Sequence, residues 1–299
     1  ALQLPSFIDT RKMAIDTDYQ NLSNNDFGEI DDRILVGPEE PAGRVRHLPK
    51  NLNKIGLARN LFRSDLLSQF EIQKNIGTPD IVLLLAGLSR GAGTGITIEV
   101  AELLKSAGVL TVASITSPFA FEGRRDEIAK TAKETLIEIG IPVIEIPLEK
   151  ILLSAEKGVA WHEVHKVVSN IISFAFSQIL NVIHKSGPMR FNFDQIQAFF
   201  SEGGEVSLSM GECELSSEFM GYQKIEMHLV TNEHNDPPAP KRRMIVVHTG
   251  KKSSIRSINA LMESLTEDIR ENSDIKISIG ISTDESMPDD RARITILEK

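Results

Sequence analysis

The sequence predicts an α/β protein with a parallel sheet in its first half, a central helix, and a smaller α+β domain at its C-terminus. Three observations support this fold class. Short apolar runs alternate with helical patterns up to about residue 150, as in a parallel sheet covered by helices. The helical pattern over residues 156–184 is apolar nearly all round, which is typical of a buried helix, here between two domains. After Gly187-Pro188, strand-like segments dominate.

In the first half, each strand-like run is followed by a helical pattern. A glycine closes two of the helices, Gly108 the second and Gly140 the third. The expected strands are residues 13–18, 80–86, 109–116 and 141–146, and the expected helices are residues 53–76, 96–107 and 122–139.

The second half predicts a mixed or antiparallel sheet with few helices. Strands are expected at residues 205–210, 223–230, 243–249, 276–281 and 291–297, and helices at residues 194–201 and 253–270. The predicted organisation is therefore a first domain over residues 1–155, a central helix over 156–186 and a second domain over 187–299.

Composition excludes several classes of protein. The 299 residues carry 33 basic and 42 acidic side chains, and the net charge of −9 argues against broad nucleic-acid binding. No apolar run approaches the roughly 20 residues of a membrane span, and the first ten residues lack the pattern of a signal peptide. Cys213 is the single cysteine, so no internal disulfide can form. We therefore expect a cytoplasmic protein.

The most informative stretch is residues 86–95, which follow a buried strand and open a helix. Gly91-Ala-Gly-Thr-Gly95 lets main-chain N–H groups turn toward an anion, and the helix dipole adds positive potential. Thr94 is expected to cap the helix or to contact a phosphate oxygen. The stretch lacks the Gly-Lys-Ser/Thr of a P-loop. A flexible turn between strand and helix is the alternative interpretation.

Several motifs in register resemble one family. Gly91-Ala-Gly-Thr-Gly95 is similar to the signature loop of FtsZ, Gly-Gly-Gly-Thr-Gly-Ser/Thr-Gly. Pro118-Phe-Ala-Phe-Glu-Gly-Arg-Arg125 resembles its Pro-Phe-x-Phe-Glu-Gly motif, and Ala14-Ile-Asp-Thr-Asp18 resembles its Ala-Ile-Asn-Thr-Asp turn. Residues 187–196 align with the loop that enters the family's second domain. The chain resembles a divergent member of the tubulin/FtsZ family along nearly its whole length.

The resemblance implies a domain that binds GTP or GDP with Mg²⁺, and a second domain whose loop completes the nucleotide site of the next subunit. It implies that the chain assembles with copies of itself into head-to-tail filaments, and other FtsZ-like proteins are further candidate partners. No nucleic acid or direct membrane contact is expected. Asp16 and Asp18 would lie near the terminal phosphate or a magnesium-bound water, Glu122 would hold the ribose, and Asn170 would face the base. The phosphates would be cradled by Arg90, Gly91, Ala92, Gly93, Thr94 and Gly95.

The chain departs from the family at several of these positions. Ser89 and Arg90 replace the first two glycines; Arg90 either binds phosphate itself or marks a loop that no longer closes around it. Asp126 stands where the family has an arginine. Asn170 replaces the aspartate that reads guanine, and since an amide accepts through a single oxygen, we expect weaker guanine preference.

The hydrolytic loop differs most. The family's Asn-x-Asp-Phe-x-Asp has its two carboxylates replaced by Asn192 and Gln195. An amide cannot act as a general base, although it can orient a water molecule. Asp194 is offset by one residue, which rotates a helical side chain by about 100°. We therefore expect slow or absent hydrolysis by these three candidate catalytic residues.

Three functions follow, in decreasing order of support. The first is an FtsZ-like GTP-binding cytoskeletal protein, active in cell division, that assembles into filaments and has weak or no GTPase activity. The second is a non-hydrolysing structural or regulatory homologue that acts through protein partners. The third is a Rossmann-like enzyme, for which no nucleophile or base is evident. His162 and His165 flank Glu163 but lack the zinc-protease spacing, so no metal-ligand cluster is expected. The family's first strand and first glycine loop have no counterpart from Ala1 onward.

Overall fold

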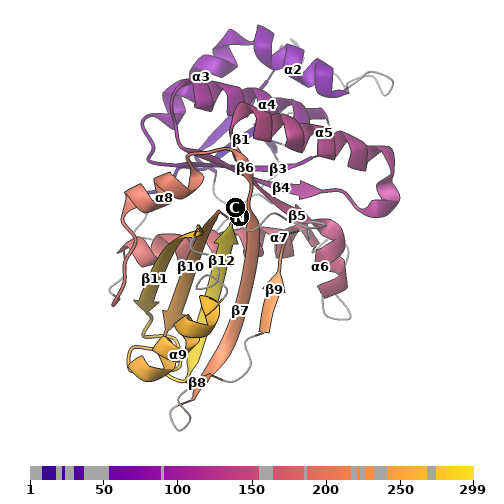
Figure 1. The fold of residues 1–299 in the computed structure, drawn as a ribbon. Helices are drawn as coiled ribbons and strands as arrows, with labels where there is room; N and C mark the ends of the chain where they lie inside the picture. Colours follow the sequence, from indigo (N-terminus) through magenta and orange to yellow (C-terminus); the bar gives the residue numbers. More distant parts are fainter. Residues whose placement is uncertain are drawn as a thin grey trace. The chain divides into compact units, whose positions relative to one another are not determined.

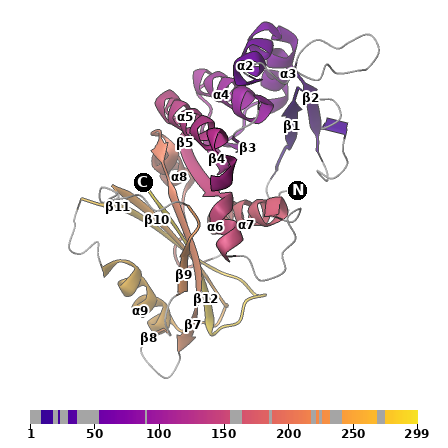
Figure 2. The same ribbon diagram turned by 90° about the vertical axis from the view of Figure 1, so that its right-hand side faces the viewer.

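The chain folds into two units, which Figures 1 and 2 show in two views of the computed structural model. Unit 1 comprises Ala1–Val164 with Glu202–Gly204, and unit 2 comprises His165–Ser201 with Glu205–Lys299. Each unit is described by itself. The described residues are 9–17, 22–23, 30–36, 54–88, 91–154, 164–184, 187–216, 221–222, 226–231, 241–267 and 274–299.

Unit 1 contains two separate sheets. The larger has the order β3-β4-β5-β6, with β3, β4 and β5 parallel, as the alternation of apolar runs predicts. The smaller is a parallel pair, β1 with β2. Every residue of β5 is buried, whereas β3 is half-buried or exposed along its length. The strands are β1 (Met13–Asp16), β2 (Asp32–Leu35), β3 (Val82–Gly87), β4 (Thr111–Ser117), β5 (Pro142–Pro147) and β6 (Gly204–Glu205).

Helices α4 (Gly91–Ser106) and α5 (Arg124–Ile139) cover one face of the larger sheet (Figure 1). Ile115 on β4 and Leu136 on α5 belong to the apolar core between them. A second core joins α4 to the smaller sheet and to α2 (Lys54–Ser64), and it contains the buried side chains Ile34, Ala58, Phe62, Ile96, Val100 and Leu104. Helix α4 thus touches both sheets of unit 1.

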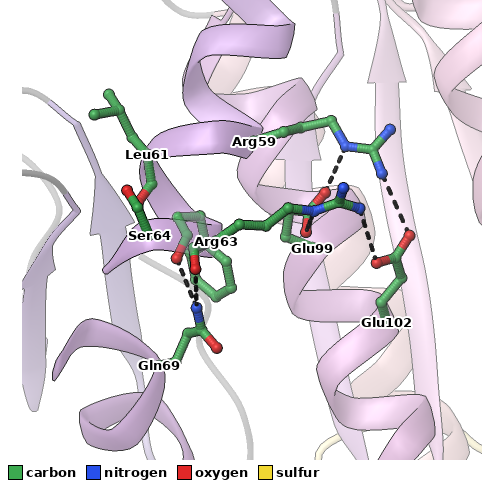
Figure 3. Close-up of polar contacts among 8 residues, drawn as sticks. Arg59, Leu61, Arg63, Ser64, Gln69, Glu99 and Glu102 are labelled. Atoms are coloured by element: carbon green, nitrogen blue, oxygen red, sulfur yellow. Dashed lines mark hydrogen bonds and ion pairs between the residues drawn. The ribbon is translucent and has the colours of Figure 1, made fainter. Parts of the chain in front are cut away.

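The helix predicted over residues 53–76 is two helices, α2 and α3 (Leu66–Ile76). Asp65 separates them as the N-cap of α3, and its Oδ1 accepts the N–H of Ser68 at 3.0 Å. The side-chain amide of Gln69 donates to the main-chain oxygens of Phe62 and Arg63, at 2.7 and 3.2 Å, which closes the end of α2 (Figure 3).

The start of α4 and two short elements also differ from expectation. Helix α4 begins at Gly91, five residues before the predicted start at 96, so the glycine stretch is helical. Strand β2 and helix α6 (Leu148–Ser154) were not predicted. Gly140 ends α5 in the left-handed conformation, with φ of 88°, as predicted.

Unit 2 is a mixed sheet in the order β11-β10-β12-β7-β8, with β9 also paired to β7. Strands β10 and β11 are parallel, and β12 is antiparallel to both β10 and β7, which confirms the predicted sheet type. The strands are β7 (Ser207–Ser216), β8 (Gly221–Tyr222), β9 (Glu226–Leu229), β10 (Arg242–Thr249), β11 (Lys276–Thr283) and β12 (Arg291–Glu298).

Helices lie on both faces of this sheet. Ile245 and Val247 pack with Leu261 of α9 (Ile255–Leu265) on one face. On the other face, the intervening His248 contacts α7 (Val164–His184), where its Nε2 lies 3.2 Å from the carbonyl oxygen of Gln178. Strand alternation therefore assigns one face to each helix.

Helix α7 contains an 18-residue stretch, Lys166–Ile183, with a mean hydropathy of 1.4, long and apolar enough to cross a membrane by length and composition. The expectation that no stretch approaches such a length was therefore wrong. Half of this stretch is buried within the protein, with Ile172, Ile179 and Val182 in its core, as in the core helix of a soluble protein. Residues 155–163, predicted as the start of this helix, lie outside the described residues.

Candidate phosphate-binding site

The glycine stretch forms the first turn of α4, directly after β3 and an undescribed pair of residues. Gly91, Thr94 and Gly95 are buried, whereas Ala92 and Gly93 are half-buried. The first N–H groups of a helix have no acceptor within the helix, and the dipole makes this end positive. The residues present therefore fit an anionic group such as a phosphate.

Gly93 is required by packing as well as by any ligand. A Cβ atom added at this position would lie 2.6 Å from the carbonyl oxygen of Gly87, a main-chain atom at the end of β3. The carbonyl oxygen of Gly93 also accepts the Thr97 hydroxyl at 2.5 Å. The start of α4 thus lies close to the end of β3.

Thr94 is not the N-cap of α4, which was one of its two predicted roles. Because α4 begins at Gly91, Thr94 is its fourth residue rather than its N-cap. Its relative exposure is 0%, and its predicted contact with a phosphate oxygen stays a prediction. The prediction placed the helix start too late.

Two acidic candidates occupy the same unit. Asp16 ends β1, is half-buried, and accepts the N–H of Thr17 through Oδ1 at 2.6 Å. Glu122 ends the short helix η2 (Ala120–Glu122), accepts the N–H of Phe119 at 3.2 Å and forms an ion pair with Arg125. The Glu122 carboxylate is therefore already held by two partners before any sugar hydroxyl is offered. Asp18, Ser89 and Arg90 lie outside the described residues.

Asp126 supplies no cation where the family has an arginine. Its Oδ2 lies 2.7 Å from Nζ of Lys130, one turn along α5. The hydrogen bond and charge of Asp126 raise the pKa of Lys130, so the Lys130 ammonium stays charged at neutral pH. Lys130 lies one turn further from the start of α5 and does not replace the missing arginine there.

A cluster of four charges fixes α4 against α2 (Figure 3). Glu99 is 5% exposed and accepts the Nε of Arg59 at 2.5 Å and the Nε of Arg63 at 2.6 Å. The carboxylate of Glu102, one turn further along α4, lies 3.3 Å from Nη2 of Arg59 and 3.4 Å from Nη2 of Arg63. The bond to Glu99 is the main cause of a raised pKa at Arg63. Sequence reasoning missed this cluster, although arginines four apart and glutamates three apart each share a helix face.

The three candidate catalytic residues lie together in unit 2, in the first turn of α8 (Phe193–Phe200). Asn192 is the N-cap: its Oδ1 accepts the N–H of Gln195 at 2.9 Å, and Oε1 of Gln195 accepts the N–H of Asn192 at 3.0 Å. This is a complete capping box. Asp194 is exposed and is the single carboxylate in this turn.

The capping box limits the chemistry available in this loop. Both amide oxygens accept main-chain N–H groups, so they are engaged as acceptors, and neither amide can take up a proton. The Asn-x-x-Gln spacing is itself a capping-box pattern, which was readable from sequence. The preceding chain is tied to β11 by a bridge between Met189 and Ile281, and Phe191 is buried, which holds α8 in place.

Asn170, expected to face a base, is exposed on α7. It belongs to unit 2, whereas the glycine turn belongs to unit 1, so its predicted proximity to a nucleotide stays a prediction. His162 and Glu163 lie outside the described residues.

Comparison with known proteins gives a consistent set of relatives, although no model of a protein family matches the chain. Cell division protein FtsZ 1 of Halobacterium salinarum is 27% identical over 287 residues, which cover 95% of this chain and 68% of the relative. Cell division protein FtsZ of Helicobacter pylori is 26% identical over 294 residues, covering 97% and 72%.

Solved structures share the fold at lower identity. An empty FtsZ dimer of M. jannaschii superposes with a TM-score of 0.71 and 21% identity, over 96% of this chain and 80% of that chain. The GDP-bound CetZ1 monomer of Haloferax volcanii gives 0.73 and 14%, over 96% and 83%. A GTPgS-bound protofilament of CetZ2 from the same organism gives 0.72 and 14%, over 96% and 82%. The two-unit arrangement of a parallel sheet with helices and a mixed sheet is therefore that of these proteins.

Proposed function

The chain is a divergent FtsZ-like member of the tubulin/FtsZ family, and on that premise we propose that it binds a guanine nucleotide and self-assembles head to tail into filaments. Its relatives are named as cell division proteins, and CetZ structures contain GDP or GTPgS, the latter in a protofilament. The observation that carries the proposal is the glycine-rich first turn of α4, which lies close to the end of β3; the first N–H groups of a helix have no intrahelical acceptor and can bind an anion.

Within unit 1, the turn Gly91–Gly95 would hold phosphate through main-chain N–H groups, mainly at the half-buried Ala92 and Gly93. Asp16 and Asp18 would lie near the terminal phosphate or Mg²⁺, which proteins commonly hold through one or two carboxylates together with phosphate oxygens. Arg90 would add a charged contact to phosphate. Glu122 would hold the ribose while keeping its bond to the Phe119 N–H, and Asn170 would face the base with reduced preference for guanine.

Hydrolysis in this proposal is slow or absent. In the capping box, Asn192 and Gln195 use their oxygens to satisfy the N-terminus of α8, and neither can act as a base. Asp194 is the single carboxylate left in that turn. The loop would therefore complete the subunit junction and orient water poorly.

A second candidate function is a non-hydrolysing structural or regulatory homologue that acts through protein partners, including other FtsZ-like proteins. Two observations favour it. Glu122 already forms an ion pair with Arg125, and Asp126, which pairs with Lys130, stands where the family has an arginine. Both would lower nucleotide affinity. Both proposals include a location in the cytoplasm. In both, the partners are proteins, and the chain contacts neither nucleic acid nor a membrane directly.

Two measurements test these proposals. Nucleotide retained after gentle purification, or titrated with GTP, GDP and ATP, separates the first function from the second: no binding at millimolar GTP would sink nucleotide-driven assembly. Phosphate release above the assembly concentration then tests hydrolysis. Replacing Asn192 and Gln195 together by aspartate restores the family's carboxylates and keeps acceptors for the cap, so it should raise turnover. If the natural sequence hydrolyses GTP rapidly and Asp194→Ala abolishes this hydrolysis, the assignment of an impaired hydrolytic loop is wrong.

A further inference from the structure

The segment that leads into α8 lies closely against strand β11. A bridge joins the two: the N–H of Ile281 donates to the carbonyl of Met189 at 2.8 Å, and the N–H of Met189 donates to the carbonyl of Ile281 at 3.4 Å. A Cβ atom added at Gly187 would overlap the carbonyl oxygen of Ile281, so the two main chains touch there. Phe191 is 3% exposed, and the Asn192 cap then begins α8. The main chain is therefore fixed on both sides of Met189.

The side chain of Met189 points from this fixed segment into solvent. Its relative exposure is 45%, the largest among the methionines whose side chains the structure describes. The other methionines of that set are buried at Met244 and Met287 and half-buried at Met13, Met210 and Met262. The packing of the chain thus leaves one thioether of this set more accessible than the rest.

An exposed thioether is the form of methionine that a peroxide oxidises most readily. A lone pair of the sulfur attacks one oxygen of hydrogen peroxide, so that an S–O bond forms and the O–O bond breaks. The proton of the transferred hydroxyl passes to the departing hydroxide, which leaves as water. Sulfur is oxidised and the peroxide is reduced, with no further reactant. The product is a polar, chiral sulfoxide, which methionine sulfoxide reductases convert back to the thioether.

The position of Met189 gives this reaction a consequence. Met189 stands three residues before Asn192, in the loop that leads to the three candidate catalytic residues. In the proposed function this loop completes the nucleotide site of the next subunit, which would bury the Met189 side chain at the junction. Burial of an apolar thioether is favourable, whereas a sulfoxide oxygen that loses water needs a new hydrogen-bond donor. Oxidation at Met189 would therefore oppose assembly.

We propose that Met189 is a reversible oxidation site, at which a peroxide weakens head-to-tail assembly. The choice of this methionine depends only on exposure and packing within unit 2. The effect on assembly rests on the proposed function. The two parts of the proposal are therefore tested by separate measurements.

Limited oxidation of the intact chain with dilute hydrogen peroxide tests the site. Mass spectrometry of peptides should show that Met189 gains one oxygen about fivefold faster than Met210 or Met262, or faster still. In urea, where burial no longer protects any methionine, the three rates should become similar. A rate at Met189 no higher than at the half-buried methionines of the folded chain would overturn the proposal.

Sedimentation of filaments before and after peroxide treatment tests the effect on assembly. With GTP, the oxidised natural chain should need a roughly tenfold higher concentration to assemble, because the buried sulfoxide lacks a partner. A methionine sulfoxide reductase should restore assembly. Met189→Leu removes the sulfur and keeps an apolar side chain, so peroxide should not change its assembly from its own untreated level. Met262→Leu is the matched control and should stay sensitive to peroxide.

Met189→Gln separates polarity from oxidation. It should assemble as poorly as the oxidised chain without peroxide, and its urea midpoint should match that of the natural chain because the side chain is exposed. Equal peroxide sensitivity of Met189→Leu and the natural chain, or full assembly of a chain oxidised at Met189, would overturn the proposal. If the untreated chain does not assemble with any guanine nucleotide, the proposed function is wrong and the effect on assembly is overturned with it. The oxidation rates still decide whether Met189 is the modified residue.

Discussion

Replacing Glu99 by glutamine tests how α4 is held in place. Glu99 is 5% exposed and accepts one Nε bond from each of Arg59 and Arg63, at 2.5 and 2.6 Å. The amide keeps a single oxygen acceptor and no charge, so the variant loses at least one charge-assisted hydrogen bond and weakens the other. A hydrogen bond to a charged group contributes roughly 1.5–3 kcal/mol, which gives an expected loss of about 2–4 kcal/mol.

Glu102→Gln is the matched control, because it faces the same two arginines one turn further along α4. Its side chain is 41% exposed and its contacts are 3.3 and 3.4 Å. Exposed pairs of this kind contribute about 0–1 kcal/mol. The two variants should therefore differ by about 2 kcal/mol, a factor of roughly 30 in the unfolding equilibrium.

Urea unfolding followed by circular dichroism measures the total effect, and hydrogen exchange of a peptide covering residues 91–106 assigns it to α4. Glu127→Gln, at an exposed position of α5, should change neither measurement. Equal losses for Glu99→Gln and Glu102→Gln, within about 0.5 kcal/mol, would refute the argument that burial decides the contribution of this cluster.

Three further predictions concern other parts of the chain. Burial raises the pKa of the Cys213 thiol to about 11, so the folded chain should not react with a thiol reagent at pH 8 and should react once it unfolds. The contribution of the protonated thiol to stability is fully present below pH 9 and should fall as the pH rises toward 11. Asn192→Ala should destabilise α8 by about 1 kcal/mol in thermal unfolding, whereas Asn192→Asp should be neutral or stabilising, because a carboxylate also caps and favours the helix dipole. Gly93→Val should destabilise unit 1 by roughly 1–3 kcal/mol in urea, because its Cβ would meet the Gly87 carbonyl at 2.6 Å, whereas Ala92→Ser should have little effect.

Local sequence determined most elements of this fold because their signals lie within a few residues. Period-two and continuous apolar runs predicted β3, β4 and β5 and, in unit 2, every strand except β8 (Gly221–Tyr222). Gly140 marked the end of α5. The same local reasoning failed at β2 and α6, which are short, and at Asp65, where a cap interrupts a helical pattern that continues beyond it. The resemblance of the glycine turn and of the other quoted motifs to the FtsZ family was likewise visible in short stretches of sequence.

The tertiary structure alone decided how the candidate site is built. That α4 starts at Gly91 and buries Thr94 depends on the close approach of Gly93 to Gly87. The Arg59–Glu99 contact joins residues 40 apart in sequence, and the bridge from Met189 to Ile281 joins a segment before α8 to the distant strand β11. Such features arise from contacts between distant parts of the chain, and burial and pairing are properties of those contacts rather than of the residues themselves.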